Sequence, residues 1–181
     1  KIFDHQRPIG ISVGGNSLDE YKFVFNKLNY SMQRKKAPHY FEINVSCPNT
    51  PEGQQMTKNP QLLETLLRHM RSETQRVIGV KYSPDTSDSD LLLFAGMLKS
   101  FPKTYLNLGN TTSRACSEVG LLDDAISLGK GGLSGPALFN RTYDMIELAA
   151  PMKIPLIATG GIDSAKKVRE LQELTRSYDI P

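Results

Sequence analysis

The sequence predicts an α/β fold built on a parallel β-sheet, and three features of the chain lead to this prediction. Short apolar segments alternate with longer amphipathic segments along the whole chain. The short segments are nearly continuous in apolar character, as expected for strands buried on both faces. Each is followed by polar or glycine-rich residues. Repeated strand and helix indicate a parallel sheet. Chemistry-bearing residues after every strand favour a (β/α)₈ barrel over an open, doubly wound sheet.

The predicted elements follow from periodicity and from helix-start residues. Apolar residues recur every three or four positions in the helices, and Pro60 stands where a first helical turn tolerates proline. Ser87 caps the third predicted helix, with Asp90 three positions later. The predicted strands are 9–13, 41–45, 77–82, 105–108 and 155–158. The predicted helices are 18–28, 60–70, 87–98, 140–150 and 164–174.

The number of strands is too small for a closed barrel. A complete (β/α)₈ barrel has eight strands and typically about 250 residues, whereas this chain has 181 residues and five predicted strands. We therefore expect residues 1–181 to form one partial barrel domain, with strands absent at both ends.

The composition narrows the function classes. The hydrophobic fraction of 39% and the charged fraction of 23% are those of an ordinary soluble protein. A net charge of +3 does not indicate a nucleic-acid partner. The sequence contains no run of apolar residues long enough for a membrane span and no signal peptide. Two cysteines, Cys47 and Cys116, indicate a reducing, cytoplasmic compartment, and the three histidines have no metal-ligand spacing, so we expect no metal site.

The segment from Asn44 to Thr50 is the strongest candidate for a site. It follows an apolar strand, and the amides of Asn44 and Asn49 flank Cys47. Amide pairs offer both donors and acceptors to a planar, amide-rich ligand, and a thiol beside them can act as an acid or base. The alternative interpretation is a small buried cysteine followed by a proline turn, and the segment alone does not separate the two.

Two glycine clusters, at 129–136 and 160–164, indicate a phosphate site. The second cluster follows the last predicted strand and begins a helix, where backbone N–H groups bind anions. Lys81 ends an apolar strand, where an ammonium group needs a partner. That partner is either Asp85, four residues on, or a cofactor that becomes anionic when it is reduced.

Six segments of the chain together resemble the dihydroorotate dehydrogenases, FMN-containing (β/α)₈ enzymes of pyrimidine synthesis. The resemblance rests on residues 9–16, 44–49, 80–85, 110–112, 131–135 and 157–162, in the order found in that family. It covers nearly the whole chain, and it implies that the predicted strands are the third to the seventh of eight.

The resemblance also implies roles for individual residues. Cys47 falls at the position of the catalytic base, which removes the C5 proton of dihydroorotate while hydride passes from C6 to flavin N5. Lys81 is expected both in catalysis and near the flavin ring. The other implied FMN contacts are Asn16, Asn44, Gly109, Gly135, Gly160 and Gly161. The implied substrate contacts are Asn44, Asn49, Asn110 and Thr111.

Within the family, the resemblance points in two directions. Cys47, together with residues 135–137, is similar to the soluble class, which uses fumarate or, through a partner flavoprotein, NAD. Residues 110–112 and 160–164 are closer to the membrane-associated, quinone-using class. We expect the soluble class, with a possible homodimer and membrane association only through a segment outside this chain. The segment from Thr50 to Met56 would be a mobile lid over the base.

Two other functions stay open. A related flavin module, the pyrimidine-reducing domain of dihydropyrimidine dehydrogenase, shares the Ser-Cys-Pro and glycine-rich features. A non-catalytic barrel fragment, stable only with a partner chain that supplies further strands, is the alternative outside enzymes. If these 181 residues were the whole protein, we would expect little catalysis, because the family's other strands supply further cofactor contacts.

Overall fold

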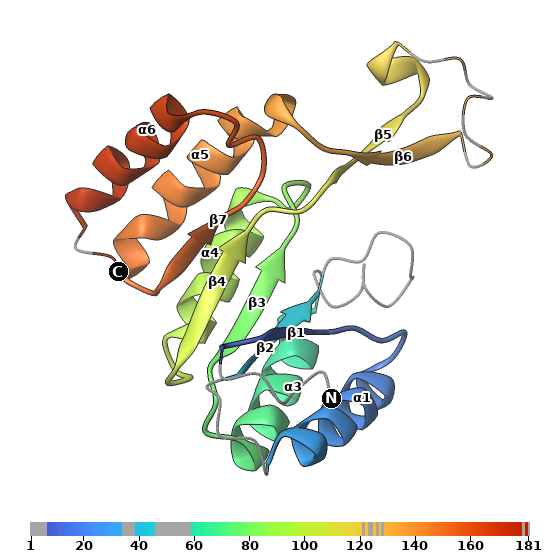
Figure 1. Cartoon of the computed structure of the whole chain (residues 1–181), viewed down its shortest axis with the longest axis vertical. Coiled ribbons are helices and arrows are strands. Elements are labelled where there is room, and N and C mark those ends of the chain that lie inside the picture. Colours follow the sequence, from blue (N-terminus) through green and yellow to red (C-terminus); the bar gives the residue numbers. More distant parts are fainter. Residues whose placement is uncertain are drawn as a thin grey trace.

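The computed structural model describes residues 7–33, 39–45, 59–120, 122, 125, 127, 129–178 and 180. Its centre is a five-stranded sheet in the order β1-β2-β3-β4-β7, in which every neighbouring pair is parallel (Figure 1). The spatial order follows the chain order, as in a barrel, whereas a doubly wound sheet reverses direction at a switch point. The strands are β1 (Gly10–Val13), β2 (Tyr40–Asn44), β3 (Ile78–Tyr82), β4 (Thr104–Leu108) and β7 (Leu156–Ala158). All five predicted strands are confirmed.

The five predicted helices are also present. Ser17, Ser87 and Ser164 cap α1, α4 and α6 by accepting a backbone N–H with the side-chain oxygen. The helices are α1 (Leu18–Met32), α3 (Pro60–Glu73), α4 (Asp88–Leu98), α5 (Phe139–Ala149) and α6 (Ala165–Arg176). None of the helices in the described part of the chain has the length and apolar character needed to cross a membrane.

The helix α1 is longer than predicted, and tertiary contacts explain the difference. Its last turn contains Asn29 and Met32, both buried. The Asn29 Nδ2 donates a hydrogen bond to the carbonyl of Glu73, at the end of α3, over 3.0 Å. A polar residue in that turn therefore has a partner that the local sequence pattern does not reveal.

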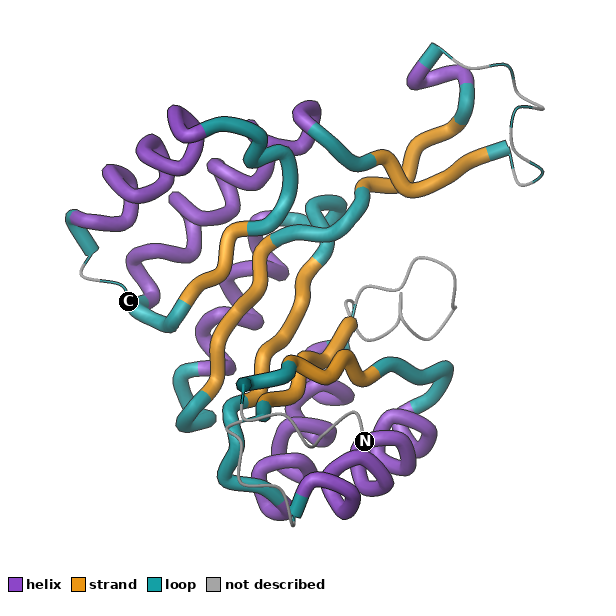
Figure 2. The backbone as a smooth tube through the Cα atoms, in the orientation of Figure 1, coloured by secondary structure: helices purple, strands orange, loops and turns teal. Residues whose placement is uncertain are grey.

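The helices lie along one side of the curved sheet (Figure 2). Alternate strand residues face them and form the helix-covered face, which is apolar and buried: Val13, Phe41, Ile43, Ile78, Val80, Tyr82, Leu106 and Leu108. The residues between them form the polar face: Ser12, Tyr40, Glu42, Asn44, Gly79, Lys81, Tyr105 and Asn107. The expectation of strands that are apolar on both faces is therefore wrong for the second face, because polar residues recur there with the period of two that a strand imposes.

A two-stranded antiparallel ribbon projects from the sheet and was not predicted (Figure 1). It consists of β5 (Thr112–Ala115) and β6 (Lys130–Leu133), in a register that pairs Thr112 with Leu133. The first glycine cluster, interpreted from sequence as a phosphate site, thus lies partly in a strand, at residues 130–133. Glycine is depleted in strands, so the pattern gave no strand signal. Three short 3₁₀ helices complete the described elements: η2 (Ser117–Val119), η3 (Pro136–Leu138) and η4 (Ala150–Met152).

Two arginines fasten the amino-terminal end of the sheet. Together Arg71 and Arg76 donate hydrogen bonds of 2.9–3.3 Å to backbone carbonyls that precede the strands or end a helix, namely those of Met32, His39, Thr74, Arg76 and Lys103. Burial lowers the pKa of the Arg71 guanidinium. Charged donors thus satisfy these carbonyls, and we assign the amino-terminal end of the sheet to stability rather than to ligand binding.

Candidate active site

The carboxyl ends of the strands bring two of the predicted binding residues, Asn44 and Lys81, into one row with Asn107, which was not predicted. Asn44 in β2 is the register partner of Lys81 in β3. Lys81 is in turn the partner of Asn107 in β4. All three belong to the polar face, so a lysine lies between two asparagines across three neighbouring strands. Such a row offers hydrogen-bond donors and positive charge to a planar ligand that carries carbonyl groups.

Asn110, which follows β4, joins this row through its side chain. Its Nδ2 donates to Oδ1 of Asn44 over 3.3 Å. Its Oδ1 accepts the backbone N–H of Thr111 over 2.9 Å, which orients the amide. The Tyr21 hydroxyl donates a hydrogen bond to the backbone carbonyl of Asn44 over 2.8 Å. Two predicted ligand contacts that are 66 positions apart in the sequence are therefore in direct contact.

Lys81 is half-buried and forms no ion pair with any described residue. The interpretation that pairs it with Asp85 is wrong. The Asp85 carboxylate instead accepts hydrogen bonds from the Thr112 hydroxyl and from the Ser113 backbone N–H. It also lies 3.5 Å from Nη1 of Arg114. Because an ammonium group on a partly buried face needs a counter-charge or polar ligand, Lys81 remains a candidate for binding an anionic or carbonyl-rich group.

The second glycine cluster lies against Leu138 and Phe139, at the start of α5. The φ angles of Gly135, Gly160 and Gly161 are +94°, +119° and +71°, values that L side chains rarely adopt. A Cβ on Gly161 would overlap the backbone nitrogen of Phe139, the first residue of α5. A Cβ on Gly160 would lie 3.5 Å from Cβ of Leu138. Packing against α5 therefore already requires glycine at position 161, and this turn lies beside a helix N-terminus, a place where anions bind.

Two other predicted cofactor residues have different surroundings. Gly109 lies against the loop after β7, and a Cβ there would overlap the Thr159 carbonyl, so packing between strands already requires glycine. Asn16 is exposed after β1, and its backbone N–H donates to Oε2 of Glu20 over 2.7 Å. Cys47 and Asn49 lie outside the described residues, as does the predicted lid from Thr50 to Met56. In the sequence they follow directly from Asn44 and Val45.

A network of hydrogen bonds on the polar face, which includes Asn107 of the row, was not predicted. Oε2 of Glu42 accepts hydrogen bonds from the Tyr105 hydroxyl at 2.8 Å and from Nδ2 of Asn107 at 3.0 Å. The Thr159 hydroxyl donates to Oδ1 of Asn107 over 2.7 Å, which links the network to the second glycine cluster. Burial, together with the hydrogen bond to Glu42, raises the pKa of Tyr105. We call Glu42, Tyr105, Asn107 and Thr159 the polar network.

Gly79 makes the polar network possible. It lies in β3, between the strands that carry Glu42 and Tyr105, and it pairs with both residues in register. A Cβ on Gly79 would overlap the Tyr105 ring. The ring therefore crosses β3 over a glycine to reach β2. The sequence indicates that Glu42 and Asn44 share a face of β2, because they are two positions apart. It does not indicate that Tyr105 reaches Glu42, because this contact depends on the register of the strands.

Within the described residues, no group of three or more histidine, cysteine, aspartate or glutamate side chains is arranged to hold a metal ion.

Comparison with known proteins identifies the same family that the sequence motifs resemble. Residues 1–173 match the family model described as dihydroorotate dehydrogenase. A dihydroorotate dehydrogenase (quinone) of Nautilia profundicola is 30% identical over 177 residues, covering 92% of this chain and 46% of the relative. The catalytic subunit of a dihydroorotate dehydrogenase B (NAD(+)) of Thermodesulfovibrio yellowstonii is 32% identical over 154 residues, covering 84% and 49%.

The fold is shared with a solved enzyme of the same name. The crystal structure of the Eimeria tenella dihydroorotate dehydrogenase in complex with ferulenol has a TM-score of 0.67 at 20% identity, covering 83% of this chain and 46% of that chain. The predicted fold class, a parallel α/β sheet that forms part of a barrel, is thereby confirmed. The chain spans about half the length of the curated relatives it matches.

Proposed function

The chain belongs to the dihydroorotate dehydrogenase family, and from this premise we propose that it acts in the FMN-dependent oxidation of dihydroorotate to orotate in pyrimidine biosynthesis. The observation that carries the proposal is the contact between the side chains of Asn44 and Asn110 in the same row as Lys81. Three strands thus present amides and one cation on a single face, which suits a flat ring with carbonyl groups and a carboxylate.

FMN fits the residues around the second glycine cluster. Gly160 and Gly161 would hold its phosphate with their backbone N–H groups beside the start of α5, and Gly135 is proposed as a further contact. Lys81 would face the ring and stabilise the negative charge that reduction brings. When bound, FMN supplies the acceptor for the hydride that leaves C6 of the substrate. Asn16 and Gly109 are further proposed contacts, although Gly109 also has the packing role described above.

The chain's own residues bind the substrate and move its proton. Asn44, Asn49, Asn110 and Thr111 are proposed to hold the ring and its carboxylate. The thiolate of Cys47 is proposed to take the proton from C5 while a hydride leaves C6, so that the C5–C6 double bond of orotate forms. An ordinary thiol has a pKa of about 8.5, and only the thiolate is a base. We therefore expect the rate of flavin reduction to rise with pH through the pKa of Cys47.

The electron acceptor is proposed from the sequence. The two relatives described above are named for quinone and for NAD(+). With cysteine at the position of the base, we propose the soluble class, in which fumarate, or NAD through a partner flavoprotein, reoxidises the flavin. Turnover with fumarate but not with a quinone would agree with this proposal, and the opposite preference would contradict it.

The proposed function is tested by loading the protein with FMN and adding dihydroorotate without oxygen. Loss of the flavin absorbance near 450 nm is expected with dihydroorotate and not with dihydrouracil. A Cys47→Ala variant should lose this reduction by at least about a hundredfold. A Cys116→Ala variant is the matched control, because Cys116 is a buried cysteine outside the proposed site. Failure to bind FMN, or equal loss in both variants, would contradict the proposal.

A further inference from the structure

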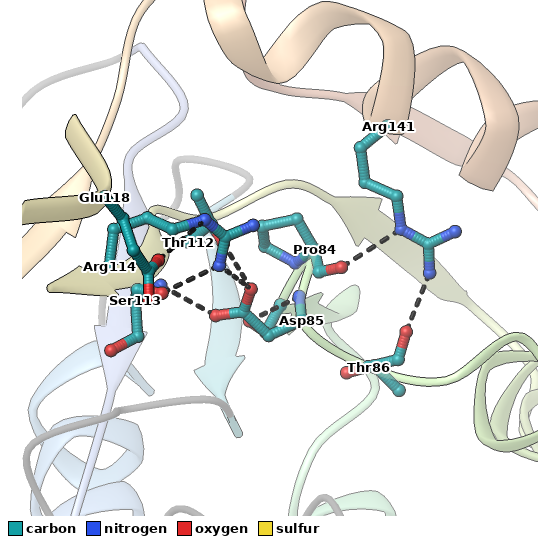
Figure 3. A network of polar contacts seen from close by, with 9 residues as sticks. Pro84, Asp85, Thr86, Thr112, Ser113, Arg114, Glu118 and Arg141 are labelled. Carbon is teal, nitrogen blue, oxygen red and sulfur yellow. Dashed lines mark hydrogen bonds and ion pairs between the residues drawn. The ribbon is translucent and has the colours of Figure 1, made fainter.

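The loop between β3 and α4, residues 83–87, is held from two sides (Figure 3). On one side Arg141, in α5, donates to the carbonyls of Pro84 and Thr86 over 3.0 and 2.7 Å. Its Nη1 also contacts Oδ1 of Asp88 at 2.8 Å. Three contacts from one partly buried guanidinium fix the backbone of the loop relative to α5.

On its other side the loop presents Asp85 to the projecting ribbon (Figure 3). The Asp85 carboxylate accepts a hydrogen bond from the hydroxyl of Thr112, which is 4% exposed. It also accepts the backbone N–H of Ser113 over 2.8 Å. The carboxylate therefore holds the first two residues of β5. Its contact with Arg114 is longer, at 3.5 Å, and both side chains are about two-fifths exposed, with values of 43% and 38%.

The residues that Asp85 holds are continuous with proposed substrate contacts. Thr112 follows Asn110 and Thr111 directly, and β5 belongs to a sheet separate from the parallel strands. The side chain of Thr111 lies against Gly132 of β6, where a Cβ would overlap its hydroxyl oxygen. A shift at the start of the ribbon would therefore move the backbone from which Asn110 and Thr111 reach the ligand.

We propose that Asp85 is a positioning residue for substrate binding, which sets the placement of Asn110 and Thr111 through Thr112 and Ser113. This inference rests on the proposed function. Among the described residues, Asp85 forms no hydrogen bond to Asn110 or Thr111. It acts by binding the start of β5 to the loop whose backbone Arg141 holds in place. The Arg114 ion pair contributes little to this role, because exposed pairs at such distances are weak.

The chemistry of Asp85 predicts which variants preserve the role. In Asp85→Ala both acceptors are lost, and the Ser113 N–H has no partner. In Asp85→Asn the remaining oxygen still accepts the Ser113 N–H, while the Thr112 hydroxyl can rotate to accept from the new amide. A Thr112→Val variant keeps the shape of the residue and removes only the donor. An Arg114→Gln variant is the control, because it removes the ion pairs with Asp85 and Glu118 and the 2.7 Å hydrogen bond to the Ser113 carbonyl but leaves both acceptors of Asp85 in place.

The test is a titration of the FMN-loaded protein with orotate, followed by the change in flavin absorbance. Asp85→Ala should raise the Kd for orotate about tenfold or more, while the Kd for FMN changes less than about twofold. Asp85→Asn should restore the Kd for orotate to within about threefold, and Arg114→Gln should leave it within about twofold of the original value. Amide hydrogen exchange at Ser113 should be faster in Asp85→Ala alone.

Several outcomes would overturn the inference. An unchanged Kd for orotate in a folded Asp85→Ala variant would do so, as would an equal weakening of FMN binding, which indicates general loss of structure. If Asp85→Ala does not fold, an unchanged Kd in Thr112→Val is the deciding result. If the original protein binds FMN but not orotate, the proposed function itself fails, and the inference fails with it.

Discussion

On one face of the parallel sheet Phe41 and Ile43 are buried among helices, and on the other Glu42 and Asn44 form hydrogen bonds to side chains in β4 and in the segment that follows it. The same five residues of β2 supply both faces. On the helix-covered face, stability comes from burial of apolar surface, which has no preferred direction. On the polar face, each group needs a partner at a defined distance and angle.

Residues that stabilise the fold and residues that can bind a ligand therefore alternate along each strand. Substitutions on the helix-covered face should lower the free energy of unfolding and affect ligand binding only through loss of structure. Substitutions on the polar face should change binding at a smaller cost in stability. Adjacent residues on the two faces therefore give matched pairs of variants, which differ in how much they are expected to lower the free energy of unfolding.

The largest effect is expected for Phe41→Ala. Phe41 is 0% exposed, and its ring centroid lies 4.9 Å from that of Phe25 in α1. Removing it should lower the free energy of unfolding by about 3–5 kcal/mol, because a cavity remains in a packed core. Urea unfolding followed by circular dichroism measures this value. Glu42→Gln, at the next position, should cost less than about 2 kcal/mol. Equal losses in the two variants would remove the distinction between the faces.

Gly79→Ala tests whether the polar face also has a packing requirement. The added methyl group overlaps the Tyr105 ring, so this ring must move away from Glu42. We expect a loss of about 1–3 kcal/mol in the free energy of unfolding. Gly96→Ala is the matched control, because a Cβ at Gly96 in α4 meets nothing within 4 Å. That change should stabilise the protein by about 0.5–1 kcal/mol.

A second substitution shows whether the Tyr105 ring causes the loss. Combining Gly79→Ala with Tyr105→Leu should recover part of the stability, because the shorter side chain leaves room for the methyl group. If the double variant is less stable than either single variant, the overlap with Tyr105 is not the reason that β3 requires glycine at this position.

Lys81→Met should change binding with little effect on stability. Lys81 is half-buried, forms no ion pair with any described residue and lies between Asn44 and Asn107. Methionine keeps the length of the side chain and removes the charge, so we expect a change below about 1 kcal/mol in the free energy of unfolding. The Kd for FMN should rise about tenfold or more. Lys103→Met is the matched control, because Lys103 directly precedes β4, at the other end of the strand. This change should leave the Kd for FMN unaltered.

The helices and the parallel strands could be predicted from the sequence, because they depend on patterns of neighbouring residues. Five strands and five helices were located because apolar runs, proline at position 60 and serine caps act within a few residues. The ligand roles of Asn44, Lys81 and Asn110 were implied by the family resemblance, and the structure brings these residues together at one edge of the sheet. The ribbon was not predicted, since Gly131 and Gly132 in β6 carry no strand signal and are specified by contact with β5 and Thr111.

Other features depend on register and on residues far apart in the chain. The hydrogen bond from Tyr105 to Glu42 joins positions 63 residues apart and crosses a strand between them. The pairing of Asp85 with Thr112 spans 27 residues, and it replaced the local partner, Lys81, that spacing had suggested. Cys47 is the clearest residue in the motif and lies outside the described residues, so its role stays a prediction.

The smallest effect is expected for Tyr82→Phe, which removes a polar atom from the helix-covered face. The Tyr82 hydroxyl is buried and forms no hydrogen bond with any described residue. Burial, with a contribution from the negative charge of Asp90, raises the pKa of Tyr82. Near neutral pH, Tyr82→Phe should change the free energy of unfolding by less than about 1 kcal/mol, in the stabilising direction. Tyr105→Phe, on the polar face, should instead cost about 1–3 kcal/mol, because Glu42 loses a donor.

The pH dependence of stability gives a second test of the burial of the Tyr82 hydroxyl. Because the folded-state pKa of Tyr82 is raised above the unfolded value of about 10, its contribution is fully present below pH 10. The contribution is lost as the pH rises further, since the unfolded chain releases the phenolic proton more readily. Urea unfolding of the original protein at pH 9 and pH 11 should therefore show a fall in stability that is smaller in Tyr82→Phe. An unchanged fall would mean that the hydroxyl is solvated in the folded protein and that the helix-covered face is less completely apolar than its burial indicates.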